Sequence, residues 1–329
     1  MQNNSASAPL NPGAARPARD VFLREVGLRD GLQIHSTFMP TEQKLAWIRA
    51  EAAAGMPEIE VTSYVPARVI PQFADAEAVT VQALGTPGLT VAALVPNLRG
   101  AERGMELGVH KLNFVMSVSR THNLKNVRRE REESMADFSR IVERIREQPE
   151  GHRPIICGGL STALGCSYEG RISVDDVVRY AVALAEAGAD EIVVADTVGY
   201  ADPTLVRTVF KRVMAEVGNL PVGAHFHDTR GTGLANVAAA LECGIRRFDS
   251  SLGGLGGCPF APGASGNIVT EDLCFMLDSM GLSTGIDLER LLAVREIAAS
   301  YLGSDSLSGA LARAGLPRHY QSAAARASA

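Results

Sequence analysis

The stretch Pro221-Val222-Gly223-Ala224-His225-Phe226-His227-Asp228 joins a short apolar run to two histidines spaced i, i+2. In an extended strand, side chains at this spacing project to the same face, roughly 6–7 Å apart along the backbone. Two such imidazoles can bind one metal ion, which then needs a hard carboxylate or amide ligand from another element. The chain offers Asp30, within Arg29-Asp30-Gly31, and Asn267, which follows a glycine-rich segment. The pattern predicts a strand whose end carries part of a metal site.

Further β-rich runs alternate with helical patterns on both sides of this stretch. We predict eight strands, over residues 21–27, 58–64, 89–95, 111–118, 154–160, 191–197, 221–228 and 246–252. Helical patterns between them include residues 41–54, 74–84, 130–147, 174–187, 203–217 and 234–242. Many of these patterns end in glycine, which is a common helix stop signal. Eight strand–helix units in about 260 residues predict an α/β fold of the closed (β/α)8 TIM-barrel type rather than an open doubly wound sheet.

The 329 residues are predicted to form one catalytic domain with short additions at both ends. We expect a disordered N-terminal tail over 1–19, the barrel over 20–284, a helical appendix over 285–316 and a disordered tail over 317–329. The first of these segments is rich in Ala, Pro, Asn and Ser and lacks the apolar core of a signal peptide.

Composition narrows the class of protein. Hydrophobic residues make up 46% of the chain, charged residues 21%, and the formal net charge is −5, so no basic surface for nucleic acid is expected. No apolar run approaches the ~20 residues of a membrane span. The five cysteines form no C-x-x-C pair, which is typical of reduced thiols in a cytoplasmic protein.

Nucleotide-binding motifs are absent from the sequence. The glycine-rich segment Gly253-Gly254-Leu255-Gly256-Gly257 does not continue as G-x-G-x-x-G, because Pro259 occupies the last glycine position. No G-x-x-x-x-G-K-[ST] segment occurs either. The sequence therefore gives no motif-based evidence for a nucleotide-binding fold.

Polar residues stand where the predicted strands end. In a TIM barrel the catalytic residues come from the C-terminal ends of the strands. Single polar residues are common at such positions, but here they recur on most strands. The residues concerned are Arg29, Asp30, Glu60, Asn97, Asp196, His225 and His227, with Asn267 and Glu271 at the start of the helix after strand eight. Their joint pattern predicts an active site at this end of the barrel.

Six motifs, in unbroken order over about residues 20 to 300, link the chain to a known family. They are Glu25–Gln33, Ile59–Ser63, Ala163–Gly170, Ala195–Gly199, His225–Thr229 and the segment Gly254–Asp272 that contains Cys258. By these motifs the chain resembles the 3-hydroxy-3-methylglutaryl-CoA (HMG-CoA) lyase family of metal-dependent barrels. Related barrels that condense acetyl-CoA with 2-oxo acids share the Arg-Asp and His-x-His parts but lack the cysteine-bearing glycine loop.

The resemblance implies a metal-dependent retro-Claisen cleavage of an acyl-CoA substrate, HMG-CoA, to acetyl-CoA and acetoacetate. It implies that a divalent Mg²⁺ or Mn²⁺ is held by Asp30, His225, His227 and Asn267. By the same resemblance, Arg29 meets the developing enolate, Cys258 is an acid/base and His225 a further catalytic group. Glu60 and Asp196 resemble family residues near the metal and substrate.

Several positions depart from the family pattern, and they bear on substrate recognition. Gln33 is followed by Ile34 and His35, where Asn and Glu are common, and basic residues stand after strands four and seven. We expect substrate contacts from Gln33, Asn97, Arg120, His122, Arg230 and Glu271.

Other functions stay open at this point. Citramalyl-CoA or an isoprenoid-extended glutaryl-CoA is an alternative substrate. A condensing transferase and a non-enzymatic remnant are less favoured. We also expect a homodimer or higher homo-oligomer that binds neither nucleic acid nor membrane.

Overall fold

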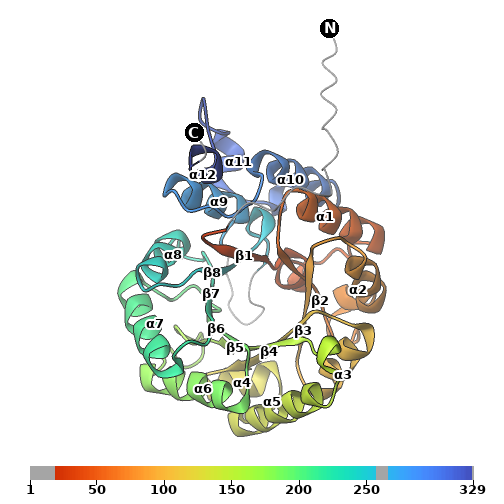
Figure 1. Ribbon diagram of the computed structural model, residues 1–329, viewed down its shortest axis with the longest axis vertical. Helices are drawn as coiled ribbons and strands as arrows, with labels where there is room; N and C mark the ends of the chain where they lie inside the picture. Colours follow the sequence, from red (N-terminus) through yellow and green to blue (C-terminus); the bar gives the residue numbers. More distant parts are fainter. Residues whose placement is uncertain (1–18, 257–265, 328–329) are drawn as a thin grey trace.

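Eight parallel strands close into a barrel in the computed structural model, which describes residues 19–256 and 266–327. Each strand pairs with its neighbour in chain order, and β1 pairs with β8 to close the ring (Figure 1). The strands are β1 Phe22–Glu25, β2 Glu58–Ser63, β3 Thr90–Val95, β4 Lys111–Ser117, β5 Ile155–Ser161, β6 Glu191–Asp196, β7 Val222–Phe226 and β8 Arg247–Ser250. The predicted TIM barrel is confirmed, and every strand lies within two residues of its predicted bounds.

Helices surround this barrel (Figure 1). They are α1 Thr41–Ala53, α2 Ala76–Leu84, α3 Leu98–Leu107, α4 Arg120–Asn126, α5 Arg131–Arg146, α6 Val174–Ala187, α7 Pro203–Val217 and α8 Gly233–Glu242. Beyond them α9 Thr270–Ser279, α10 Leu288–Leu302, α11 Ala310–Ala314 and α12 Ala323–Ala327 gather beside α1 and β1. Among the described helices, none is long and apolar enough to cross a membrane.

Local sequence explains where the helices begin and end. Helix α7 begins with Pro203 at its first position, and the carboxylate of Asp202 accepts hydrogen bonds from the amides of Thr204 and Leu205. Proline suits this position because its missing N–H has no intrahelical partner there. Helix α6 ends at Gly188, whose φ of 104° lies in the left-handed region that favours glycine. These signals are the ones that made both helices predictable.

The C-terminal residues differ from the predicted disordered tail. Residues 317–327 fold back onto α9, where the Tyr320 hydroxyl and the Ala323 amide both donate hydrogen bonds to the Asp278 carboxylate. Asp278 is only 2% exposed, so its carboxylate needs donors from the protein. This tertiary requirement has no counterpart in the local composition of the segment.

The two faces of the barrel strands differ in polarity. Residues that face the helices are apolar and fully buried, among them Leu23, Ile59, Leu112, Ile192 and Phe248. The alternate positions carry Arg24, Glu58, Lys111, Glu191 and Asp249, which are also buried. Their side chains bond between strands that are not neighbours, such as β4 and β6, and can meet only across the lumen.

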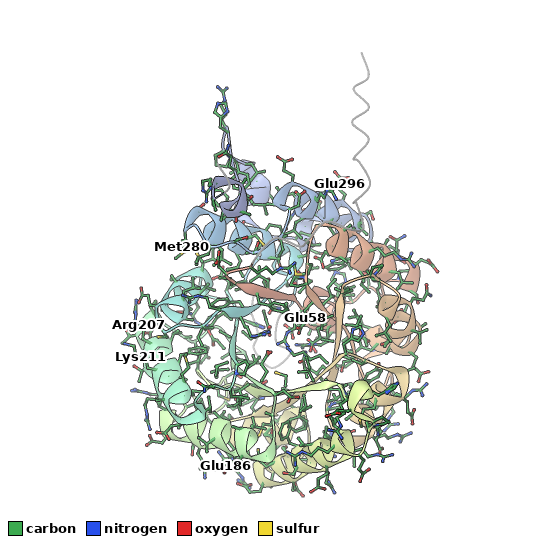
Figure 2. The ribbon with its side chains drawn as sticks, viewed as in Figure 1. Glu58, Glu186, Arg207, Lys211, Met280 and Glu296 are labelled. Carbon is green, nitrogen blue, oxygen red and sulfur yellow. The ribbon has the colours of Figure 1, made fainter. Side chains whose placement is uncertain are left out.

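Charged side chains therefore occupy an interior that TIM barrels usually fill with layers of branched apolar residues. Figure 2 shows Glu58 inside the ring, whereas Glu186, Arg207 and Lys211 lie on the outer helices.

A second group of buried acidic residues lies between β1 and α1. Glu25 accepts hydrogen bonds from the amides of Gly27 and Leu252 and from the Thr270 hydroxyl. Burial raises its pKa to about 8 despite these donors. Glu51 of α1 is fully buried, and burial raises its pKa well above the usual value. At neutral pH the Glu25 carboxyl is therefore held largely protonated.

The raised pKa of Glu51 predicts a loss of stability in alkali. An acid with a higher pKa in the folded state binds more protons when folded, so its contribution is complete below pH 4.5 and declines as pH rises toward the folded pKa. Glu51→Gln has no such proton to lose. We expect the drop in Tm between pH 6 and pH 9, measured by calorimetry, to be smaller in the variant by roughly 2–4 °C. Glu42→Gln, at an exposed position of the same helix, should keep the wild-type drop. An equal pH dependence in Glu51→Gln and wild type would contradict this interpretation.

Candidate metal and active site

A tight turn after β1 places two of the predicted site residues. Residues Gly27–Gly31 form a single π-helical turn in which the Val26 carbonyl accepts from the amides of Arg29, Asp30 and Gly31. The turn is pressed against α1, because a Cβ at Gly27 would lie 2.9 Å from the Trp47 ring. Only glycine fits there, and the rigid turn aims Arg29 and Asp30 toward the end of the lumen.

Asp30 meets His225, which lies in β7, and His227, which directly follows β7. One ligand atom from each of Asp30, His225 and His227 lies within 4.8 Å of the others, and all three residues are buried. The imidazole centroids are 5.1 Å apart, and Nε2 of His227 lies 3.4 Å from Oδ2 of Asp30. Three potential ligand atoms from two distant parts of the chain therefore converge on one point.

Asn267 joins this group through the bridge that its backbone forms with His227. Its Nδ2 donates to Oδ2 of Asp30 at 2.7 Å and to the Leu255 carbonyl at 3.0 Å. Its Oδ1 is buried, and no donor reaches it from the described residues. An amide oxygen left in this state beside a carboxylate and two imidazoles completes a donor set that suits a hard divalent cation such as Mg²⁺ or Mn²⁺.

The charge on Asp30 is fixed by its surroundings. Burial alone would raise its pKa, but the charge of Arg29 and the contact with His227 outweigh burial and hold the pKa well below its usual value. Oδ1 accepts from Nη1 of Arg29 at 2.5 Å and from Nε2 of Gln33 at 3.0 Å. The carboxylate is thus ionised, and Gln33 serves it as a donor.

Arg29 is itself anchored by a second carboxylate. Its Nε donates to Oε2 of Glu60, and Oε1 of Glu60 accepts from Nδ2 of Asn113 at 2.7 Å. Glu60 is 1% exposed, so its charge has no solvent to stabilise it and depends on these donors. Arg29 therefore presents a positive charge from a defined position next to Asp30.

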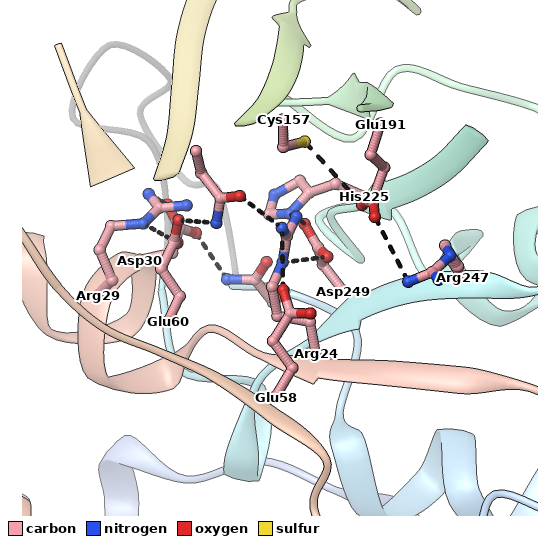
Figure 3. Close-up of polar contacts among 12 residues, drawn as sticks. Arg24, Arg29, Asp30, Glu58, Glu60, Cys157, Glu191, His225, Arg247 and Asp249 are labelled. Atoms are coloured by element: carbon pink, nitrogen blue, oxygen red, sulfur yellow. Dashed lines mark hydrogen bonds and ion pairs between the residues drawn. The ribbon is translucent and has the colours of Figure 1, made fainter. Parts of the chain in front are cut away.

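His225 has a partner that the sequence reasoning missed. Its Nδ1 lies 3.1 Å from Oδ2 of Asp249, which Arg24 binds through Nε and Nη2 at 2.8 and 2.7 Å (Figure 3). Burial would raise the pKa of Asp249, but Arg24 and His225 hold it well below its usual value. A carboxylate at Nδ1 fixes the ring orientation and leaves Nε2 as the nitrogen available to a metal.

A sequence signal for these residues does exist. Charged residues at every second position of parallel strands, as at Arg247 and Asp249, are unusual, because such strands are buried on both faces.

Three other predicted residues have local partners. Asp196 ends β6 and accepts from the amides of Tyr200 and Ala201, and burial raises its pKa. Asn97 caps α3 by accepting from the Gly100 amide. Glu271 is fully buried, accepts from the Gly253 amide and pairs with Arg295. Through these contacts each side chain supports a loop or helix near the site.

The basic residues after strands four and seven are also engaged locally. Arg120 is exposed and pairs with Glu130 at 2.5 Å. Arg230 donates to the carbonyls of Val198 and Gly199 and stacks on Tyr200.

His122 is buried beside Oγ of Ser117, and burial lowers its pKa to about 4, so it is neutral at pH 7. Cys258 lies outside the described residues.

Comparisons with known proteins agree with this geometry. The sequence model of the HMGL-like family matches residues 20–298. The chain is 42% identical to the hydroxymethylglutaryl-CoA lyase of Bacillus subtilis, over 84% of this chain and 91% of that protein. It is 40% identical to the cytoplasmic 3-hydroxy-3-methylglutaryl-CoA lyase of Rattus norvegicus, over 83% and 78%. An HMG-CoA lyase from Acinetobacter baumannii, solved in complex with coenzyme A and 3-methylmalate, superposes with a TM-score of 0.85 at 40% identity, covering 92% of this chain and 97% of that one.

The converging ligand atoms predict tight binding of a divalent cation that depends on His227. We expect His227→Ala to weaken Mn²⁺ binding, measured by calorimetric titration, by at least about 100-fold, since loss of an outer-shell partner alone costs about 10–100-fold. His152→Ala, at an exposed histidine, provides the control and should bind as wild type does. Equal affinity in all three proteins would remove His227 from the ligand set.

Proposed function

Because the chain belongs to the HMGL-like family, we propose that it is a carbon–carbon lyase that cleaves HMG-CoA to acetyl-CoA and acetoacetate. The observation that carries the proposal is the convergence of Asp30, His225 and His227, with Asn267 beside them and the Arg29 guanidinium adjoining. This arrangement combines a cation site with a fixed positive charge at the open end of a barrel, where TIM-barrel enzymes hold their substrates.

The metal is a proposal supported by the donor chemistry. Asp30, His225, His227 and Asn267 would hold Mg²⁺ or Mn²⁺, with one negative charge among the four ligands. Such a cation supplies Lewis acidity, which lowers the pKa of a substrate hydroxyl. The short turn after β1 and the Asp249 carboxylate at His225 hold the ligands in place beforehand, so little reorganisation accompanies binding.

In the proposed reaction, the 3-hydroxyl loses its proton and the C2–C3 bond breaks. One half leaves as the ketone, acetoacetate. The thioester half becomes an enolate and gains a proton at carbon, which releases acetyl-CoA. Cys258 is the group we propose for the proton transfer at carbon, and His225, with its Nδ1 held by Asp249, would act through the cation that lowers the pKa of the hydroxyl.

Arg29 suits the stabilisation of the enolate oxygen. Its Nε binds Glu60 and its Nη1 binds Asp30, which fixes the plane of the guanidinium. A donor already oriented toward the developing charge costs no reorganisation during the reaction. Lysine would be poorer, because it lacks this fork and can lose its proton.

The substrate belongs to the acyl-CoA class. The Acinetobacter enzyme binds coenzyme A and 3-methylmalate, which supports a CoA thioester with a carboxylate-bearing acyl group here. Gln33, Asn97, Arg120, His122, Arg230 and Glu271 remain our proposed substrate-binding set, although most contact their own neighbours in this structure. Citramalyl-CoA, whose cleavage gives acetyl-CoA and pyruvate, is the main alternative because the same chemistry would cleave it. A cytoplasmic homodimer or higher homo-oligomer also remains a proposal.

A panel of thioesters tests the function and its substrate together. We expect kcat/KM for HMG-CoA to exceed that for citramalyl-CoA by about tenfold or more, since a polar contact in the acyl pocket shifts discrimination by orders of magnitude. Excess chelator should abolish turnover, and added Mg²⁺ or Mn²⁺ should restore it. A tenfold preference for citramalyl-CoA would replace the substrate and leave the chemistry standing. Cleavage of neither thioester would contradict the proposed function.

The anchored Arg29 predicts a specific kinetic defect. Arg29→Gln removes the charge at the developing enolate, so kcat should fall by roughly 10²-fold while the Mn²⁺ affinity changes little. Steady-state kinetics and calorimetry measure the two quantities. Arg103→Gln, at an exposed arginine of α3, removes only two surface ion pairs and should leave both quantities unchanged. A defect confined to KM would instead assign Arg29 to substrate binding.

A further inference from the structure

A continuous chain of polar contacts crosses the lumen and joins the two parts of the site. One end is His225, reached through Asp249 and Arg24. The other end is Arg29, reached through Glu60. Asn113 of β4, which is 6% exposed, connects these two arms across the lumen. Its Oδ1 accepts from Nη1 of Arg24 at 2.9 Å, and its Nδ2 donates to Oε1 of Glu60 at 2.7 Å.

We propose that Asn113 is a positioning residue. It holds Glu60 in place, and Glu60 in turn holds the guanidinium of Arg29 beside the metal site. This inference rests on the proposed lyase function for its kinetic consequence. The contacts themselves are independent of any substrate. Asn113 does not belong to any of the predicted ligand or substrate-binding sets, and β4 contributes no other residue to this chain of contacts.

The amide side chain is required by what lies on either side of it. Arg24 offers only donors, and Glu60, when ionised, offers only acceptors. An acidic residue at position 113 would place a carboxylate oxygen against Oε1 of Glu60, and the two negative charges would repel. A basic residue there would place a positive charge against that of Arg24. An apolar residue would leave a buried donor and a buried carboxylate oxygen without partners, which is costly. An amide of this length satisfies both neighbours at once.

Glu60 depends on Asn113 because its two oxygens have divided tasks. Oε2 accepts from Arg29 and Oε1 from Asn113. Without Asn113 the carboxylate is fixed at one oxygen only, and the Arg29 guanidinium loses a rigid partner. A displacement of about 1 Å in a positioned group can cost about 10²-fold in rate.

The metal arm does not share this dependence. Arg24 binds Asp249 through Nε and Nη2, and it reaches Asn113 through Nη1. Loss of the Asn113 contact leaves the bidentate pair with Asp249 intact, and with it the support of His225. Disturbance at Asn113 should therefore lower the rate without loosening the cation.

A pair of substitutions isolates the contact between Asn113 and Glu60. Asn113→Asp keeps an acceptor for Arg24 but sets two carboxylates against each other. Asn113→Asp combined with Glu60→Gln moves the negative charge from position 60 to position 113. The new amide at position 60 would then donate to the new carboxylate at position 113 and accept from Arg29, so every hydrogen bond of the chain is kept. We expect kcat to fall by roughly 10- to 100-fold in Asn113→Asp and to recover by about tenfold in the double variant.

Two further measurements separate positioning from a general structural effect. The Mn²⁺ dissociation constant of Asn113→Asp, from calorimetric titration, should stay within about threefold of wild type, because the Arg24–Asp249 pair persists. Asn123→Asp makes the same change at a buried asparagine of α4 that bonds to Arg129 and Ser134. It should lower stability with little change in kcat, and Glu60→Gln should not rescue its stability.

Three results would overturn the inference: a wild-type kcat in Asn113→Asp, defects that simply multiply in the double variant, or a loss of Mn²⁺ affinity parallel to the loss of rate.

The midpoint of urea unfolding should fall in Asn113→Asp and recover in the double variant, and this measurement needs no substrate. If the wild-type protein cleaves no thioester, the lyase proposal fails, while the urea series still decides whether the contact exists. If Asn113→Asp does not fold, Asn113→Ala serves, and the same fall in kcat at unchanged Mn²⁺ affinity is expected.

Discussion

The ion pair between Arg24 and Asp249 is the contact on which the rest of the site depends. These residues are register partners on β1 and β8, the first and last strands, so their bidentate bond spans the seam where the barrel closes. Two ions buried in this way cost more desolvation than they return in stability unless their remaining hydrogen-bonding positions are filled. Here they are filled by His225 on one side and by Asn113 on the other. The closure of the fold and the orientation of the His225 ring thus share one interaction.

Two buried carboxyl groups in one short segment have opposite protonation states, because the charges around them differ. Asp30 and Glu25 are both buried and five positions apart. Asp30 faces Arg29 and two imidazoles, which hold its pKa well below the usual value. Glu25 receives only neutral donors and lies near other acids, so burial prevails and its pKa is about 8. The first is suited to bind a cation, and the second acts as a neutral clamp on the turn that carries the first.

The fold and the grouping of Asp30 with the two histidines were predictable from the sequence because their signals are local. A His-x-His at a strand end and glycines at helix ends need only a few residues to be recognised, and the resemblance supplied Asp30 and Asn267. The charged lumen did not follow, since its contacts join positions as distant as Arg24 and Asn113, which meet only after the barrel has closed. Polar residues at strand ends were ambiguous for another reason. Asn97 caps a helix and Asp196 holds a loop, and neither use leaves a mark that distinguishes it from a substrate contact.

The residues proposed for chemistry and those proposed for specificity lie in different parts of this molecule. Arg29, Asp30 and His225 are held by one strand and one rigid turn, through bonds between buried side chains whose geometry leaves little freedom. Of the residues expected to choose the acyl group, Arg120 begins α4 and Arg230 follows β7, and both satisfy their charge or hydrogen bonds with neighbours at the surface. A substrate carboxylate would have to compete with Glu130 for Arg120, and such an exposed ion pair is weak because water screens both charges. Exchange of partners at the loops is therefore inexpensive, whereas any change in the lumen disturbs several buried charges at once. Substrate preference can consequently shift among such barrels while the bond-breaking chemistry stays the same.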